Sequence, residues 1–166
     1  MVEVTPQTVI MVGESRYCMV LLKERDGSRL LPIGMRVHRA QPIVLWMKGI
    51  RLGRPQTHDL FIEVVEKLGA ELIGIAVYGV EQGALLSRVI LHKSDEQIAL
   101  ECRSSDGIAV ALKKGIPITV ADEIMAVAAF RPQQSSTDGA GAESDEEEEK
   151  LTAFRDFIDG LDLNGL

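Results

Sequence analysis

The sequence contains little cysteine and few aromatic residues. Of its 166 residues, two are cysteines, one is a tryptophan and two are tyrosines. Cys18 and Cys102 lie inside apolar stretches, and two thiols do not make the disulfide framework of a small secreted domain. No CxxC spacing or nearby histidine indicates half of a metal site at either position. Scarce tryptophan and tyrosine leave few platforms on which single-stranded nucleic acid could stack.

The sequence also lacks a basic leader and a long apolar run. Glu3 lies where a signal peptide would carry basic residues, and no apolar window approaches the ~20 residues that span a bilayer. We therefore predict a soluble, cytoplasmic chain without a membrane partner. Glycine-rich phosphate loops, a Gly-x-Ser-x-Gly motif and zinc-binding spacings are absent too, so the aliphatic stripes are interpreted as core.

Acidic residues are missing from one segment and concentrated in another. The formal net charge is -7, yet residues 1–130 hold fifteen acids and fifteen bases, whereas residues 131–166 hold ten acids and three bases. Residues 27–58 contain no acid. The candidate nucleic-acid-binding residues of this stretch are Arg36, Arg39, Lys48, Arg51 and Arg54. The basic segment 29–54 is interpreted as a nucleic-acid footprint, as a merely solvated face, or as a surface masked by the acidic tail.

Composition divides the chain into three parts. Residues 1–130 have the apolar content of one globular domain with a core. Residues 131–149 are rich in Ser, Gln, Gly, Ala and Glu and predict a disordered acidic linker. Residues 150–166 recover a helical spacing of Leu and Phe and predict a short amphipathic C-terminal helix. That helix must bury its apolar face against the body of the domain or against a second chain. Together with the apolar strands, it leads us to expect a homo-oligomer, a dimer or higher.

Apolar periodicity and turn residues predict the elements of the domain. Strands are expected at residues 8–12, 17–23, 29–33, 71–78, 84–92, 97–103 and 116–120. Helices are expected at residues 40–47, 57–68, 104–114 and 121–130. Thr57 and either Ser104 or Ser105 are the expected N-caps of two of these helices. The predicted fold is α+β: a mixed, largely antiparallel sheet with two or three packed helices.

Two predicted helix starts carry residues suited to phosphodiester hydrolysis. His58 and Asp59 lie at one start, and Arg103 and Asp106 lie at the other. Free backbone N–H groups at such starts attract anions. If both starts face one cleft, we expect His58 to act as general base, Arg103 to stabilise phosphate charge, and Asp59 and Asp106 to ligate a divalent metal, Mg or Mn.

The same four residues also suit a purely structural role. Aspartates in the first turn of a helix are ordinary partners of the helix dipole. Arg103 could pair with either aspartate and lock two helix starts together, and His58 could be a hydrogen-bonded structural histidine. The residue types alone leave both interpretations open.

Four stretches of the sequence resemble the bifunctional nuclease family. They are residues 31–33, 54–60, 103–112 and 115–120, in the family's order and at similar spacing. The most specific is Arg54-Pro55-Gln56-Thr57-His58-Asp59-Leu60, and residues 154–158 are similar to a C-terminal helix of bacterial members. The resemblance, over residues 17–128, implies a mixed sheet flanked by helices, oligomerisation, and nuclease activity on DNA and RNA.

The chain departs from the family pattern at several positions. Gly34-Met35-Arg36 stands where members usually have Trp-Ile-Gly, and Glu101 and Ser104 replace an aspartate and a proline. Arg39 stands where members usually have glutamate, so one expected carboxylate has reversed its charge. The alternative function is therefore a catalytically inactive oligomeric module, binding or regulatory, with the same fold.

Overall fold

The computed structural model describes residues 1–13 and 16–132. The predicted acidic linker and C-terminal helix lie outside the described residues, apart from the first two positions of the linker. Within the described residues, seven strands form one sheet in the order β3-β2-β1-β7-β4-β5-β6. Their bounds are β1 Val2–Met11, β2 Tyr17–Glu24, β3 Leu30–Arg36, β4 Glu71–Glu81, β5 Ala84–Lys93, β6 Glu96–Arg103 and β7 Ile118–Val120.

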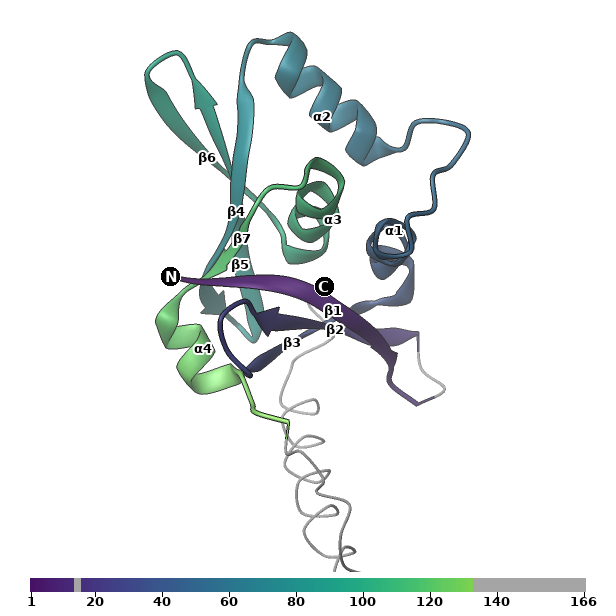
Figure 1. Cartoon of the computed structure of the whole chain (residues 1–166), viewed down its shortest axis with the longest axis vertical. Helices are drawn as coiled ribbons and strands as arrows, with labels where there is room; N and C mark the ends of the chain where they lie inside the picture. Colours follow the sequence, from purple (N-terminus) through teal and green to yellow (C-terminus); the bar gives the residue numbers. More distant parts are fainter. Residues whose placement is uncertain (14–15, 133–166) are drawn as a thin grey trace, which may run out of the picture.

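The sheet consists of two antiparallel three-stranded units joined by one short strand. One unit holds β1, β2 and β3, and the other holds β4, β5 and β6. Between them β7 pairs antiparallel with β1 and parallel with β4. Figure 1 shows the two units running at a steep angle to each other. The predicted mixed, largely antiparallel sheet of an α+β fold is confirmed.

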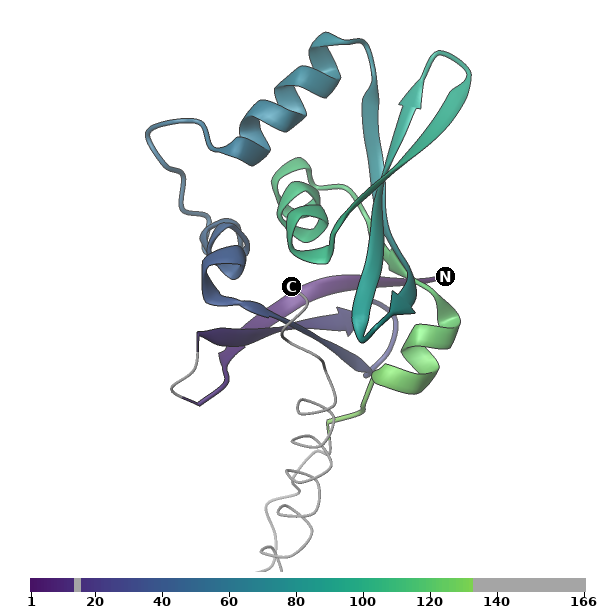
Figure 2. The same cartoon turned by 180° about the vertical axis from the view of Figure 1, so that it is seen from behind.

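Four helices accompany the sheet within the described residues. They are α1 Val37–Met47, α2 Thr57–Lys67, α3 Ser104–Lys114 and α4 Asp122–Ala128. Figures 1 and 2 show α1, α2 and α3 together on one side of the sheet, with α4 away from them. None of these helices is long and apolar enough to cross a membrane. Helix α3 contacts both α1 and α2, and His58 and Asp59 lie in the first turn of α2.

The first strand is longer than the sequence pattern predicts. It begins at Val2, and its first residues pair with β7, Val2 opposite Val120 and Val4 opposite Ile118. The alternation of Val2 and Val4 with polar neighbours is the period of a strand, but a bulge between Pro6 and Thr8 interrupts it. The prediction of a strand confined to residues 8–12 was wrong for that reason.

Helix α3 is the most deeply buried helix and lies close against the sheet. Its residues from Gly107 to Ala111 are all buried. A Cβ placed on Gly107 would lie 2.9 Å from Cγ2 of Ile75 on β4 and 3.3 Å from Sγ of Cys102. The absent side chain therefore sets how near α3 lies to the sheet, and with it the position of Asp106.

The N-cap of α2 is not the predicted residue. Gln56 is the N-cap, and Thr57 is the first helical residue. The start is closed from inside the helix, because Oδ2 of Asp59 accepts a hydrogen bond from the backbone N–H of Gln56 at 2.6 Å. The expected cap at Thr57 was therefore wrong.

The N-cap of α3 also differs from the prediction. It is Arg103, which makes no side-chain capping hydrogen bond. The hydroxyl of Ser104 donates to the carbonyl oxygen of Leu85 at 3.3 Å and lies 2.7 Å from the hydroxyl of Ser87 on β5. Ser104 thus joins helix to sheet instead of capping the helix, and the first backbone N–H groups of α3 receive no side-chain cap from Arg103.

Candidate active site

Helices α2 and α3 bring His58 and Asp106 together. Nε2 of His58 lies 3.5 Å from Oδ1 of Asp106. The side chain of His58 is largely buried, with 18% exposed, whereas that of Asp106 is 48% exposed. The pair is therefore accessible from its aspartate side.

Three basic side chains act on the carboxylate of Asp106. The hydrogen bond from His58 is the main cause that holds the pKa of Asp106 below its ordinary value, and the charges of His58, Arg103 and Arg39 act in the same direction. Partial burial of the carboxylate opposes them. Asp106 is consequently ionised at neutral pH, within an environment of positive charge contributed by α1, α2 and the start of α3.

Asp59, the neighbour of His58 in sequence, has a different partner. It forms an ion pair with Lys113, and both side chains are mostly buried. The ammonium of Lys113 also lies 4.5 Å from the ring centroid of Trp46, a cation–π contact with α1. Burial first, and the charge of Arg51 second, lower the pKa of Lys113. The ion pair places the carboxylate of Asp59 directly against this ammonium.

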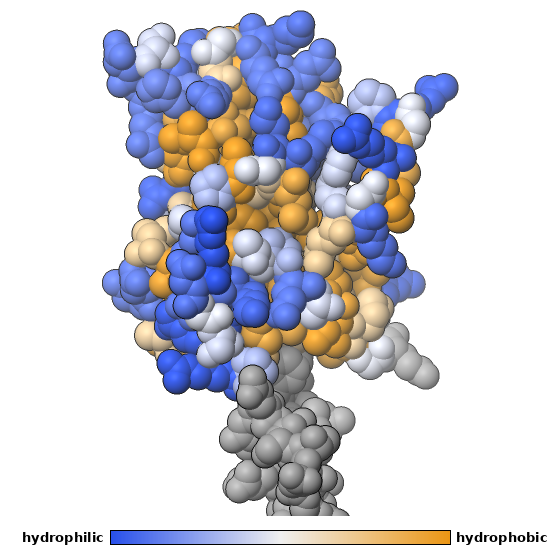
Figure 3. Space-filling view, viewed as in Figure 1, coloured by the Kyte–Doolittle hydropathy of each residue, from blue (hydrophilic) through white to orange (hydrophobic). Residues whose placement is uncertain are grey.

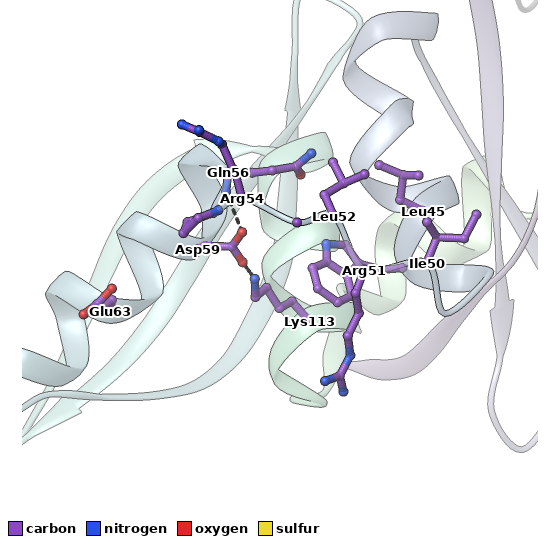
Figure 4. A pocket seen from close by; sticks show the side chains of 12 residues that line it. Leu45, Ile50, Arg51, Leu52, Arg54, Gln56, Asp59, Glu63 and Lys113 are labelled. Carbon is purple, nitrogen blue, oxygen red and sulfur yellow. Dashed lines mark hydrogen bonds and ion pairs between the residues drawn. The ribbon is translucent and has the colours of Figure 1, made fainter.

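A cleft of about 520 Å³ opens beside this second pair. Its lining comes from the end of α1, the loop that follows, α2 and α3: Leu45, Trp46, Ile50, Arg51, Leu52, Gly53, Arg54, Pro55, Gln56, Asp59, Glu63 and Lys113. Figure 4 shows Asp59 and Lys113 pointing toward each other in the middle, with Leu45, Ile50 and Leu52 on one side and Glu63 on the other.

Comparison with known proteins identifies the family. A family model described as the bifunctional nuclease domain matches residues 20–133. The chain belongs to this family. An uncharacterized protein of Mycobacterium tuberculosis (strain H37Rv) is 32% identical over 144 residues, which cover 86% of this chain and 84% of the relative.

Two plant relatives of this bifunctional nuclease domain carry the activity in their names. Bifunctional nuclease 1 of Oryza sativa subsp. indica is 27% identical over 123 residues, 72% of this chain and 37% of the relative. Bifunctional nuclease 2 of Oryza sativa subsp. japonica is 32% identical over 108 residues, 61% of this chain and 32% of the relative. The matched region spans about a third of each plant protein.

The basic side chains of the segment have different surroundings in this bifunctional nuclease domain. Arg39 belongs to the surroundings of Asp106, and Arg51 and Arg54 line the cleft. The guanidinium of Arg36 lies 5.5 Å from the ring centroid of Tyr17, and Lys48 is exposed just after α1. Within the described part of the chain, the buried Nε atoms of Arg36 and Arg39 have no hydrogen-bond acceptor. Two guanidinium groups thus retain donors for an anion.

The predicted metal ligands are engaged separately. Asp106 pairs with His58, and Asp59 pairs with Lys113. Across residues 1–13 and 16–132, no three His, Cys, Asp or Glu side chains are grouped closely enough to hold a metal ion.

Sequence reasoning gave no site role to Lys113 or Trp46. Lys113 lies seven residues after Asp106, two turns later on the same side of α3, and this spacing was the available signal. Trp46 carried no signal beyond being the one tryptophan in the chain.

Proposed function

We propose that this chain hydrolyses phosphodiester bonds of DNA and RNA at the His58–Asp106 pair. The observation that carries the proposal is the contact between these two side chains across the starts of α2 and α3, with Arg39 and Arg103 acting on the same carboxylate. The family supports the reaction class, and the printed names of the plant relatives support it further.

The pair has the arrangement of a histidine base and its orienting carboxylate. Asp106 holds the Nε2 side of the His58 ring, which leaves Nδ1 to accept a proton. In the proposed step, Nδ1 takes a proton from water while the water oxygen forms a bond to phosphorus. The bond from phosphorus to the leaving oxygen breaks, and the imidazolium returns the proton to that oxygen. A positioned base of this kind typically contributes 10²–10⁴-fold.

Arg39 and Arg103 are proposed to stabilise the phosphate. Charge that develops on phosphate oxygens is best stabilised by fixed cations that are already in place. Both arginines act electrostatically on Asp106, and the buried Nε–H of Arg39 has no acceptor among the described residues. A phosphate oxygen beside Asp106 would supply one.

A divalent metal does not fit this set of donors well. Mg²⁺ favours near-octahedral oxygen ligands and is usually held by one or two carboxylates with water and phosphate. Here Asp59 pairs with an ammonium, and the carboxylate of Asp106 lies within reach of three basic side chains. We therefore assign no step to a metal. Dependence on Mg or Mn, with Asp59 and Asp106 as ligands, stays a prediction for the cleavage assay.

Cleavage of labelled single-stranded DNA, duplex DNA and RNA tests the proposal. The purified full chain is compared in magnesium, in manganese and with EDTA. We expect His58→Gln to lower the rate by 10²–10⁴-fold, as for loss of a general base. Matched controls are His92→Gln and Asp95→Asn, which change exposed residues of the β5–β6 hairpin. Cleavage that His58→Gln leaves unchanged would refute the assignment and point to a contaminating enzyme.

Substitution of Arg39 tests whether the chain is an active nuclease or an inactive member of the family. If Arg39 stabilises phosphate, Arg39→Glu should lower cleavage by about 10²-fold or more, because it places a like charge beside the substrate. If instead Arg39 has destroyed a metal site, the same change should create metal-dependent cleavage. The sign of the change decides between the two functions.

The alternative of an oligomeric binding module has one observation in its favour. Leu60, Val64 and Leu68 occupy successive turns of α2 and just beyond it, and are 60%, 46% and 66% exposed. Figure 3 shows apolar residues reaching the surface on the face seen in Figure 1. A stripe of this kind suits contact with a second chain. Sedimentation of the wild type and of Val64→Glu tests it, and a monomeric wild type excludes self-association through α2.

A further inference from the structure

The residues that line the cleft beside the Asp59–Lys113 pair have no role in the proposed hydrolysis. One part of its wall is apolar and includes Leu45, Trp46 and Leu52. Ile50 and Leu52 are 44% and 50% exposed, although burial of such side chains is favourable. An open apolar wall next to basic side chains is a common feature of ligand sites.

We propose that this cleft binds one unpaired nucleotide of the substrate strand, with its base against the apolar wall at Trp46 and a neighbouring phosphate at Arg51 and Arg54. The inference rests on the proposed function, because it defines the substrate of the same site as single-stranded or locally unpaired nucleic acid. A base held in a duplex cannot present its face to such a wall.

The parts of the cleft match the parts of a nucleotide. Aromatic and aliphatic side chains accept the flat face of a base, and stacking of this kind tolerates any sequence. Gln56 and Glu63 supply polar groups near the cleft for the edge of the base. The volume of about 520 Å³ lies in the ordinary range for small-molecule sites.

Three basic side chains (Arg51, Arg54 and Lys113) and two acidic ones (Asp59 and Glu63) line the cleft, a positive balance that favours an anion. Arg51 and Lys113 are close enough for Arg51 to act against the charge of Lys113. Only Asp59 pairs directly with that lysine among the residues that line the cleft. Arg51 and Arg54 are exposed on the loop after α1, where they can reach a phosphate without first being desolvated.

The cleft is next to the proposed reaction site. His58 and Asp59 are adjacent on α2, and Asp106 and Lys113 lie two turns apart on the same side of α3. Seven residues of helix rise roughly 10 Å, so both places lie within the reach of one strand. A nucleotide bound in the cleft would therefore fix which phosphate meets His58.

The single tryptophan gives the test a direct signal. The full chain is titrated with a cleavage-resistant phosphorothioate oligothymidylate, and Trp46 emission is followed. We expect a saturable change with the single strand and none when the same strand is in a duplex. Equal changes with both would overturn the proposal, and so would equal displacement of the oligonucleotide by polyglutamate, which would indicate an unspecific anion site.

Variants locate the site. Arg51→Gln and Arg54→Gln should each lower the dependence of log affinity on log salt concentration by about 0.7, the value for one phosphate contact of a single strand. With a labelled oligonucleotide, Trp46→Leu should weaken binding about tenfold or more. Lys93→Gln removes the same charge from the far hairpin and should change neither. If Lys48→Gln has the effect of Arg51→Gln, a diffuse basic face binds the strand and the cleft does not.

The two proposals fail in different ways. Cleavage that is normal in Arg51→Gln, Arg54→Gln and Trp46→Leu, with His58→Gln inactive, overturns the nucleotide cleft and keeps the nuclease. Quenching of Trp46 by single strands in a wild type that cleaves nothing overturns the nuclease. If Trp46→Leu misfolds, Arg51→Gln and Arg54→Gln still test the proposal, because their side chains are exposed and their substitution should not disturb the fold.

Discussion

Two of the three ion pairs between α2 and α3 in the described residues differ although their α2 members are adjacent in sequence. Asp59–Lys113 is mostly shielded, and Asp59 also accepts the hydrogen bond that closes the start of α2. His58–Asp106 is half open, and two further arginines act on its carboxylate. The first pair has the surroundings of a structural contact, and the second has those of a reactive site. Under the proposed function, the first of two neighbouring residues would take part in the chemistry and the second would hold the helix start in place.

The largest effect on stability should come from the shielded pair. Asp59→Ala removes the helix-closing hydrogen bond and leaves Lys113 without its carboxylate, next to Arg51. We expect a loss of about 2–3 kcal/mol in the free energy of unfolding, measured by urea denaturation. Glu66→Gln, which breaks the more exposed Glu66–Lys114 pair, is the control and should cost under about 0.5 kcal/mol. Equal effects of the two variants would show that the shielded Asp59–Lys113 pair stabilises the chain no more than the exposed Glu66–Lys114 pair does.

A smaller effect is expected where α3 meets the sheet. Gly107→Ala places a Cβ 2.9 Å from the side chain of Ile75, which is 1% exposed and has no room to move. The overpacking should cost about 1–2 kcal/mol after the gain in helix propensity is subtracted. Because Gly107 follows Asp106, the rate of the proposed cleavage should fall by a larger factor than the equilibrium constant for folding. A Gly107→Ala variant as stable and as active as the wild type would show that α3 shifts freely.

The pH dependence of stability should distinguish the half-open His58–Asp106 pair from the shielded Asp59–Lys113 pair. Because the pKa of Asp106 is lowered in the folded chain, its stabilisation is present above about pH 4, the unfolded value, and is lost as pH falls through the folded pKa. Asp106→Asn should therefore melt below the wild type at pH 6, with the two melting temperatures converging in acid. The effect is small because the side chain is half exposed and screened by solvent. A gap that stays constant with pH would contradict this assignment.

The smallest expected effect concerns the acidic C-terminal residues and their competition with nucleic acid for the basic side chains around both pairs. Residues 133–166 hold ten acids and two bases, and the sequence suggests that they compete with nucleic acid. Changing Glu146, Glu147, Glu148 and Glu149 to glutamine should raise affinity for single-stranded DNA a few-fold at low salt, and less at roughly 0.15 M. Affinity that is unchanged at low salt would end the masking hypothesis.

The sequence predicted the elements and the sheet better than it predicted contacts between side chains. Local periodicity and turn residues place most strands and helices, because both depend on neighbours along the chain. Local patterns do not decide which face of α2 is buried. Its apolar residues occur on more than one side, and the helix buries Ile62 and Val65 while it exposes Leu60 and Val64. Only the position of the sheet beneath the helix decides between those sides.

The sequence named the candidate residues but not their partners, and the site itself stays a prediction. The motif singled out His58, Asp59, Arg103 and Asp106, and the structure brings all four to the α2–α3 contact. Which aspartate pairs with which base depends on the packing of the two helices. Lys113 takes Asp59, and His58 takes Asp106, and no local pattern could have assigned those partners.

The three residues of β7 affect the order in which the domain can be completed during synthesis. They pair with the first residues of the chain on one side and with β4 on the other. Until residue 120 has left the ribosome, the adjoining edges of β1 and β4 have no strand between them. Contacts of such long sequence separation slow folding, and unpaired edges favour aggregation. Nascent chains that stop before Ile118 should therefore need a chaperone more than chains that end after Val120.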